Sequence, residues 1–313
     1  MRARAMLHAW IWLAACVAAS CAAAGAARHQ PDEAALRAEL EALASGFEGD
    51  VGIYLRRLEG GAEVAIRADE AFPTASLVKV PIALGLLAKV EAGELDWKQP
   101  VAYSKERHSR GGDDLVAKLV DGAKIEPSKL LFLMESVSDN TASVMCQELA
   151  GGGSAINAWL DARGWKATRV NSRVAGREAD YKLHGWGQTT PREMAEMLVA
   201  IRQRRAVSPA ADELLDRMLG RAYWDGEALC ALPSDVHAIS KQGAVNASRS
   251  EALLVSAPSG AYVLCVITKN QKDQSWEDGN AGFRLLRQAS AIAWRHMEPS
   301  RPHEAPIDGP RWP

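Results

Sequence analysis

The chain has 313 residues, of which 48% are hydrophobic and 24% are charged, and its formal net charge is −2. This length and composition suit one large globular domain or two closely packed ones. The sequence has no strongly basic stretch, so a nucleic-acid partner is not expected. A nearly neutral charge says little about the substrate.

Residues 1–27 have the pattern of a secretory signal peptide. Arg2 and Arg4 precede a mostly apolar stretch, and a run of small residues follows it. The apolar stretch is too short and too rich in alanine to favour a permanent membrane span. Cys16 and Cys21 each end a sequence typical of lipoprotein processing, so contact with a membrane is expected only if one of them is lipidated. We expect a monomer that is exported and is periplasmic or secreted.

The remaining chain predicts strands at both ends and helices in the middle. A helical period covers residues 32–44, and a helix is expected to begin at Ser76. Between 126 and 221 further helices are expected over 127–136, 141–149, 155–163 and from Thr190 onwards, with a long loop of functional type over 166–188. The expected strands are 51–58, 62–66, 236–242, 251–257 and 261–269, and a final helix covers 281–297.

This order predicts two parts with a site between them. Residues 28–75 and 222–298 would form an α/β domain, and residues 76–221 an all-α domain inserted into it. The proline-rich residues 299–313 are expected to be a disordered tail.

Ser76 and Lys79 are the first residues that indicate chemistry. They are three residues apart at the expected start of a helix, so both side chains lie on one face and the amine can reach the hydroxyl. A serine hydroxyl is a poor nucleophile until a base removes its proton, and a desolvated lysine can be that base. Ser and Lys are common residues, so the pair alone is a weak signal.

Two further motifs strengthen that signal. Ser138-Asp139-Asn140 and then Lys241-Gln242-Gly243 follow in order along the chain. Together with Ser76 and Lys79 they resemble the penicillin-recognising serine hydrolases, and most closely the class A β-lactamases. The resemblance covers roughly residues 35–297. It implies a β-lactamase/transpeptidase-like fold of the α/β plus all-α class, with an antiparallel sheet flanked by helices and a helical insertion domain.

The resemblance also implies a role for each motif residue. Ser76 would attack the amide carbonyl, and Lys79 would share its proton network, with a pKa lowered by burial and by Lys241. Ser138 would relay a proton to the leaving nitrogen. Asn140 would hold a substrate amide and Lys79.

The residues after these have binding or structural roles in the same family. Lys241 would orient Ser138 and attract a substrate carboxylate. The backbone N–H groups of Ser76 and Ala244 would form the oxyanion hole, in which each donor is often worth about 3 kcal/mol. Asp139 would be a buried structural carboxylate.

The chain departs from the family pattern after Lys241. Gln242 stands where the family usually has Thr or Ser, whose hydroxyl helps to bind the carboxylate of a β-lactam. The Gln242 amide can still donate a hydrogen bond. Arg249 could supply a bidentate contact to that carboxylate, or it could be a solvated charge at a strand end.

A second departure concerns the base that hydrolyses the acyl-enzyme. The family register places Val174 where class A enzymes have a loop glutamate, and valine cannot act as a base. Glu178, about one helical turn later, is our candidate for the deacylating base. The alternative is a solvated charge that pairs with Arg177 or Arg173. Asp180 is a weaker candidate.

No cofactor or metal is expected. His108, His184 and His237 do not have the spacing of metal ligands. Outside the signal peptide, Cys230 and Cys265 are the one pair worth testing for a disulfide, and the alternative is that these two and Cys146 are buried thiols.

The sequence therefore predicts an exported serine β-lactamase that forms an acyl-enzyme at Ser76. Two other functions stay open. One is a peptidoglycan peptidase or esterase with a peptidoglycan-like substrate, and the other is a penicillin-binding protein that deacylates slowly.

Overall fold

The computed structural model describes residues 30–310, so the expected signal peptide with Cys16 and Cys21 lies outside the described residues. Within residues 30–310 no helix has both the length and the apolar character that a membrane span requires.

A five-stranded antiparallel sheet forms the α/β layer, as predicted. Its spatial order is β2 (Glu63–Ile66), β1 (Asp50–Arg57), β10 (Tyr262–Lys269), β9 (Ser248–Val255) and β8 (Ala238–Val245). The two ends of the chain meet in this sheet, because β1 pairs with β10 from Asp50 opposite Lys269 to Arg57 opposite Tyr262. Every residue of β9 is buried, which requires both faces of the sheet to be covered.

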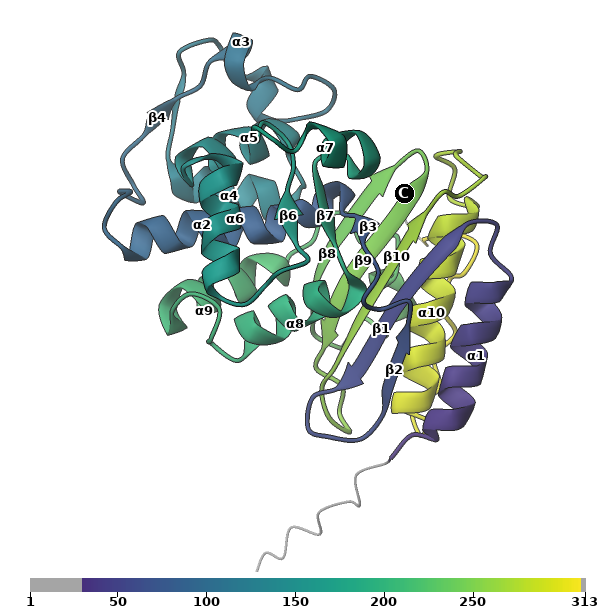
Figure 1. Cartoon of the computed structure of the whole chain (residues 1–313). Helices are drawn as coiled ribbons and strands as arrows, with labels where there is room; N and C mark the ends of the chain where they lie inside the picture. The colour runs from purple at the N-terminus through teal and green to yellow at the C-terminus, as the bar shows by residue number, and fades with distance from the viewer. Residues whose placement is uncertain (1–29, 311–313) are drawn as a thin grey trace, which may run out of the picture.

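Helices from both ends of the chain cover one face of the sheet. These helices are α1 (Glu33–Ser45) and α10 (Ala281–Met297), which lie side by side in Figure 1. The carboxylate of Asp32 caps α1 by accepting from the backbone N–H groups of Ala34 and Ala35. One hydrophobic core fills the space between these helices and the sheet.

The helical part lies on the opposite face of the sheet (Figure 1). Its main helices are α2 (Lys79–Glu91), α4 (Pro127–Ser136), α5 (Asn140–Leu149), α6 (Gly152–Ala162), α8 (Pro191–Arg202) and α9 (Pro209–Leu219). Helix α8 packs directly on β1, β9 and β10. A second hydrophobic core therefore runs from the helices to the sheet without interruption. The domain boundaries at residues 76 and 221 stay a prediction.

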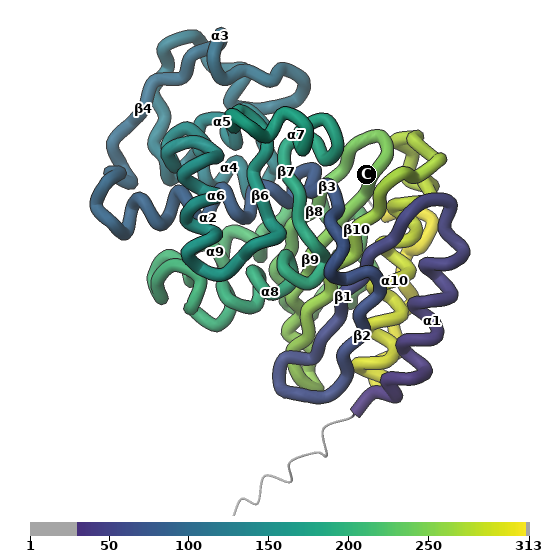
Figure 2. Tube along the Cα trace, in the orientation of Figure 1, coloured from purple at the N-terminus to yellow at the C-terminus, as the bar shows by residue number. Residues whose placement is uncertain are grey.

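The segment expected to be a loop over 166–188 has regular structure of its own. It contains β6 (Arg169–Val170), α7 (Glu178–His184) and the start of β7 (Gly187–Thr189), and β7 pairs with both β6 and β3 (Phe72–Pro73). The side chain of Asn157 fixes this segment to α6 by hydrogen bonds to the backbone of Val170. Figure 2 shows the trace of the segment between the helical part and the sheet.

The remaining elements are short. They are α3 (Lys105–His108), the two-residue strands β4 (Val101–Ala102) and β5 (Lys124–Ile125), and the 3-10 turns Ala75–Val78, Val116–Lys118 and Leu229–Ala231.

The structure corrects two details of the expected fold. Residues 299–310 have no helix or strand, but they lie against α10 and are not a free tail: Trp294 donates to the carbonyl of Arg301, and Arg287 donates to that of Ile307. Cys230 and Cys265 are free thiols, as is Cys146, so the suggested disulfide is not present. Buried thiols were the alternative. Cys146 and Cys265 are buried, whereas Cys230 is half-buried.

Candidate active site

Ser76 lies in a tight turn between β3 and α2. The turn is a 3-10 helix over Ala75–Val78, and α2 begins directly after it at Lys79. Ala75 has a φ of 44°, a left-handed conformation that a non-glycine residue rarely adopts. The sequence predicted one helix through both residues. The observed turn still brings the Lys79 amine to 3.0 Å from the Ser76 hydroxyl oxygen.

Lys79 is the centre of the polar contacts. Its side chain is fully buried. Besides Ser76 Oγ, its Nζ lies 2.5 Å from the backbone oxygen of Ser138, 2.9 Å from Ser138 Oγ and 2.8 Å from Asn140 Oδ1. The first two motifs of the sequence are thus joined through a single amine.

Lys241 approaches the same hydroxyl from the sheet. It lies on β8 with 2% of its surface exposed, and its Nζ is 3.1 Å from Ser138 Oγ. Its other contacts are the backbone oxygen of Gln242 at 3.0 Å and the Gln242 side-chain oxygen. Ser138 therefore stands between two lysines, where it can pass a proton from one side to the other.

The loop that carries Ser138 and Asn140 is fixed by carboxylates. Asp139 caps α5 by accepting from Ala142 N at 2.7 Å, and it also accepts from Val116 N, so it is a buried structural residue as expected. Asp114 accepts from the backbone N–H groups of Asn140 and Thr141. Ser138 itself has a φ of 59°, and these contacts hold that strained backbone in place.

Burial lowers the pKa values of both lysines, and a like charge lowers that of Lys79 further. Burial, and then the positive charge of Lys241, lower the pKa of Lys79 well below its usual value. Burial also lowers the pKa of Lys241 to about 8, against the opposing effect of nearby carboxylates, of which Glu135 has the largest. Lys79 is therefore the lysine better suited to be neutral and to accept a proton.

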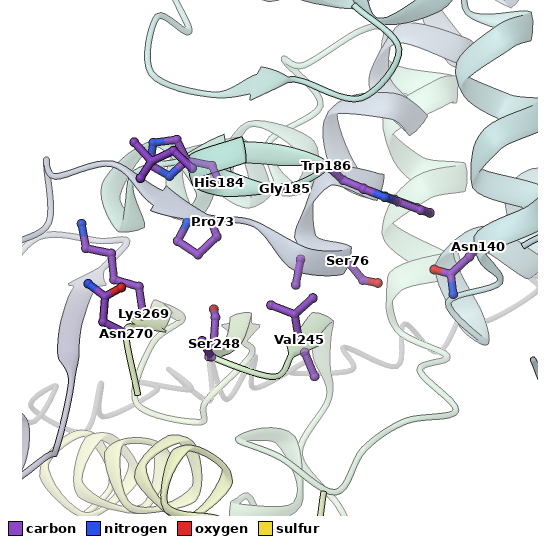
Figure 3. A pocket seen from close by; sticks show the side chains of 14 residues that line it. Pro73, Ser76, Asn140, His184, Gly185, Trp186, Val245, Ser248, Lys269 and Asn270 are labelled. Carbon is purple, nitrogen blue, oxygen red and sulfur yellow. The ribbon is translucent and has the colours of Figure 1, made fainter. Parts of the chain in front are cut away.

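A cavity of about 650 Å³ opens onto Ser76. Figure 3 shows Asn140 at one end of its lining and Lys269 and Asn270 at the other, with Ser76 and Trp186 in between. Ala244, the expected second donor of the oxyanion hole, also lines it. The turn and β8 approach so closely that a side chain on Gly243 would place its Cβ 2.8 Å from Ser76 N. Glycine is therefore required at this position.

Gln242 does not line this cavity. Its side-chain oxygen accepts from Lys241 instead. In this structure Gln242 contributes to the site through Lys241, and its predicted contact with a substrate carboxylate stays a prediction.

The structure does not place Arg249 in the lining of this cavity, so its contact with a substrate carboxylate stays a prediction. The alternative of a solvated charge at a strand end is wrong, because Arg249 is buried. It pairs with Ala244 across the hairpin, and its side chain lies on the face of the sheet away from the Ser76 turn, where it is fully buried. Its guanidinium lies between the rings of Trp276 and Phe283, 4.5 Å from each centroid, and donates to the carbonyl of Ser275. Successive side chains of a strand point to opposite faces of a sheet. Because the neighbouring Ser250 faces the Ser76 turn, Arg249 faces away from it.

The structure does not bring Glu178 to Ser76 or Lys79. Glu178 is exposed at the start of α7, and its carboxylate accepts from Gly176 N at 3.1 Å. It lines a second cavity, of about 500 Å³, which shares only Trp186 with the first. Val174 is buried and packs on Gly153, so the position of the family glutamate belongs to the core.

The alternative for Glu178 was an ion pair with Arg177 or Arg173. Neither pair is found within residues 30–310, and Arg177 pairs with Asp180 at 3.0 Å instead. Asp180 is thereby engaged in the loop and does not contact Lys79.

Sequence reasoning missed two acidic residues of the site. Asp114 lies in an irregular segment and offers no sequence signal. Glu135 is buried, and both lysines act on its charge. Its signal in the sequence was a single acid directly after the apolar run 130–134 of α4, one turn before Ser138. In the part of the chain that the structure describes, His, Cys, Asp and Glu form no group of three that could hold a metal ion.

Comparisons with known proteins identify the family and the fold. A family model described as "Beta-lactamase enzyme family" matches residues 35–297. The "Beta-lactamase regulatory protein BlaB" of Streptomyces cacaoi is 38% identical over 112 residues, which are 36% of this chain and 35% of that protein. The chain thus spans about a third of this relative's length.

Two other matches extend along most of the chain. A "Beta-lactamase" of Amycolatopsis lactamdurans is 26% identical over 272 residues, which are 84% of this chain and 85% of that protein. The structure of PBP-A, solved as a leucine-to-glutamate variant in an acyl-enzyme complex with penicillin G, has a TM-score of 0.75 at 23% identity and covers 85% of this chain and 97% of its own.

Solved class A β-lactamases also share the fold. The family resemblance predicted from the three motifs is confirmed. The chain belongs to the β-lactamase enzyme family.

Proposed function

We propose that this chain is an exported serine β-lactamase that opens the lactam amide through an acyl-enzyme at Ser76. One observation carries the proposal: the buried Lys79 amine lies 3.0 Å from the Ser76 hydroxyl, and its pKa is lowered by burial and by Lys241. A neutral amine at that distance can take the proton as the oxygen attacks.

The remaining contacts support a complete acylation step. Ser76 Oγ bonds to the carbonyl carbon while its proton passes to Lys79 Nζ. When the carbon–nitrogen bond breaks, the leaving nitrogen takes a proton from Ser138 Oγ. That hydroxyl is replenished from Lys79, which lies 2.9 Å away. Lys241 supplies the positive charge for a carboxylate on the substrate.

The location of the protein is a separate part of the proposal. Residues 1–27 support export to the periplasm or the medium, with membrane attachment only through Cys16 or Cys21. We propose a monomer.

Intact mass spectrometry with benzylpenicillin tests the proposal. Wild-type protein should gain the mass of the whole penicillin, and Ser76→Ala should gain none. Ser248→Ala is the matched control, because Ser248 lines the same cavity with a buried hydroxyl that has no partner within the described residues. An adduct on Ser76→Ala, or its loss from Ser248→Ala, would contradict the assignment of the nucleophile.

A protein that deacylates slowly is the second candidate. The buried Val174 and the exposed Glu178 favour it, because neither supplies a carboxylate to the Ser76 site. An adduct that persists after free penicillin is removed would identify this function, whereas an adduct that clears with release of penicilloate would identify a β-lactamase. Cleavage of D-Ala-D-Ala peptides without any lactam adduct would point to a peptidase.

A further inference from the structure

Glu135 is a buried acid that the acylation step above does not use. It is the second-last residue of α4, one turn before Ser138, and 2% of its surface is exposed. Neither of its carboxylate oxygens has a hydrogen-bond partner within residues 30–310. Burying an ionised carboxylate without partners is costly, so its environment must favour the charge in another way.

The surroundings of Glu135 are closed on all sides. Helix α4 packs against α2, α5 and α9. The backbone oxygens of Ser136 and Val137, directly after Glu135, accept from Tyr223 N at 2.8 Å and from the Trp224 ring nitrogen at 2.9 Å. The carboxylate is thus held inside the protein, and it does not belong to the lining of the cavity.

Two lysines are the positive charges that act on this carboxylate. Burial raises the pKa of Glu135 to about 7, and Lys241 and then Lys79 oppose that rise. The third titratable group that faces it is the Cys146 thiol on α5, whose pKa is raised well above its usual value, so it stays uncharged. The effect is mutual, because Glu135 is the largest influence that opposes the fall in the pKa of Lys241.

We propose that Glu135 is a positioning residue of this active site, whose buried carboxylate is the shared counter-ion of Lys79 and Lys241 and sets how many protons the two amines hold. This inference rests on the proposed acylation of Ser76. The negative charge near the two lysines would then come from a buried residue of α4, and not from Val174 or Glu178 in the segment 166–188.

The charge of Glu135 matters at the moment Ser76 loses its proton. In the proposed resting state Lys241 is protonated, Glu135 is ionised and Lys79 is neutral. When Lys79 takes the serine proton, two ammonium groups lie around Ser138 Oγ, with contacts of 2.9 and 3.1 Å. The carboxylate stabilises this state, which exists only during the reaction, and so it accelerates acylation.

The variant Glu135→Gln keeps the shape and removes the charge. Both lysines then hold their protons less tightly. A weaker base at Lys79 should lower the maximum acylation rate about tenfold, and the loss of the Lys241 proton should move the alkaline limb of the pH profile about one unit lower. The measurement is the acylation rate with benzylpenicillin across the range in which lysines titrate.

Glu227→Gln is the matched control. Glu227 is a half-buried acid that acts on Lys241, but it is not among the charges that act most on Lys79. This variant should move the alkaline limb and leave the maximum rate unchanged. A Glu135→Gln profile that coincides with wild type, or a maximum rate that falls equally in both variants, would overturn the proposal.

Two additions keep the test decisive. Glu135→Asp retains the charge, so the alkaline limb of its pH profile should coincide with that of wild type. This variant keeps the proposal testable if Glu135→Gln fails to fold. An alkaline limb displaced about one unit lower in Glu135→Asp would contradict the proposal. The same profiles are measured with a fluorophosphonate, which labels reactive serines without a lactam. A shift seen with that probe in a protein that penicillin does not acylate would support Glu135 and reject the β-lactamase function.

Discussion

The two sides of the Ser76 cleft differ in how completely their polar groups are connected. On the inner side, Lys79 and Lys241 are buried and both reach Ser138 Oγ. On the loop side, the residue in the glutamate register is the core residue Val174, and the nearby acid Glu178 is exposed and bonded to its own loop. The first side has the contacts that the proposed acylation of Ser76 requires, whereas on the second side neither Val174 nor Glu178 offers a carboxylate to Ser76. The proposed acylation and the removal of the acyl group can therefore be tested separately.

The largest expected effect comes from breaking the inner side at Lys79. Lys79→Met keeps the length of the side chain and removes the amine, so Ser76 loses its base. We expect the rate of acylation by benzylpenicillin to fall about 10²- to 10⁴-fold, the usual contribution of general-base catalysis. Time-resolved mass spectrometry measures this rate.

Lys89→Met on the same helix is the control for Lys79→Met. Lys89 is partly exposed and pairs with Glu94, away from the cleft. Its acylation rate should equal that of wild type. A Lys79→Met protein that acylates at the wild-type rate would show that another group activates Ser76.

The inner side could be predicted from sequence because its residues belong to short motifs. Ser76 and Lys79 are three residues apart, and Ser138 and Asn140 flank the cap of one helix, so local geometry fixes much of their placement. The sheet was predicted for a similar local reason, because its strands are short runs of mostly apolar residues. The differences there are small: β8 continues to Val245, where the sequence predicted an end at Gln242.

The positions of Arg249, Glu135 and Glu178 depend on contacts between segments far apart in the sequence, which motif spacing does not reveal. Which face of β9 carries Arg249 is decided by the register of the β8–β9 hairpin. The burial of Glu135 requires α2, α5 and α9 to be in place around α4. The direction of the Glu178 side chain depends on where α7 begins, and a loop without a clear period does not reveal that.

The substitution Arg249→Ala should have an effect of intermediate size, on the stability of the protein and not on acylation. Arg249→Ala removes a buried guanidinium that lies between two rings and donates to backbone carbonyls, among them that of Ser275. The free energy of unfolding should fall by about 2–4 kcal/mol, because the carbonyls would stay buried without a donor. Denaturant unfolding measures this change.

The surface ion pair of Arg284 with Asp308 gives the control for Arg249→Ala. Arg284→Ala should change the free energy of unfolding by no more than about 0.5 kcal/mol. Folded Arg249→Ala should still be acylated by benzylpenicillin at the wild-type rate. A selective loss of affinity for lactams that carry a carboxylate would instead support Arg249 as a substrate-binding residue.

The smallest expected effect is that of Glu178→Gln, and it tests the loop side directly. Its carboxylate accepts from Gly176 N in a cavity that shares only Trp186 with the Ser76 cavity, so it is not placed to activate a water molecule at the acyl carbonyl. The rate of deacylation should stay within about twofold of wild type, as for an exposed residue outside the chemistry. Pulse-labelling with penicillin, removal of the free drug and timed intact-mass spectra measure that rate. Accumulation of an adduct that wild type clears would mean that α7 turns toward Ser76 once the acyl group is bound, and the contrast between the two sides of the cleft would then hold only for the free enzyme.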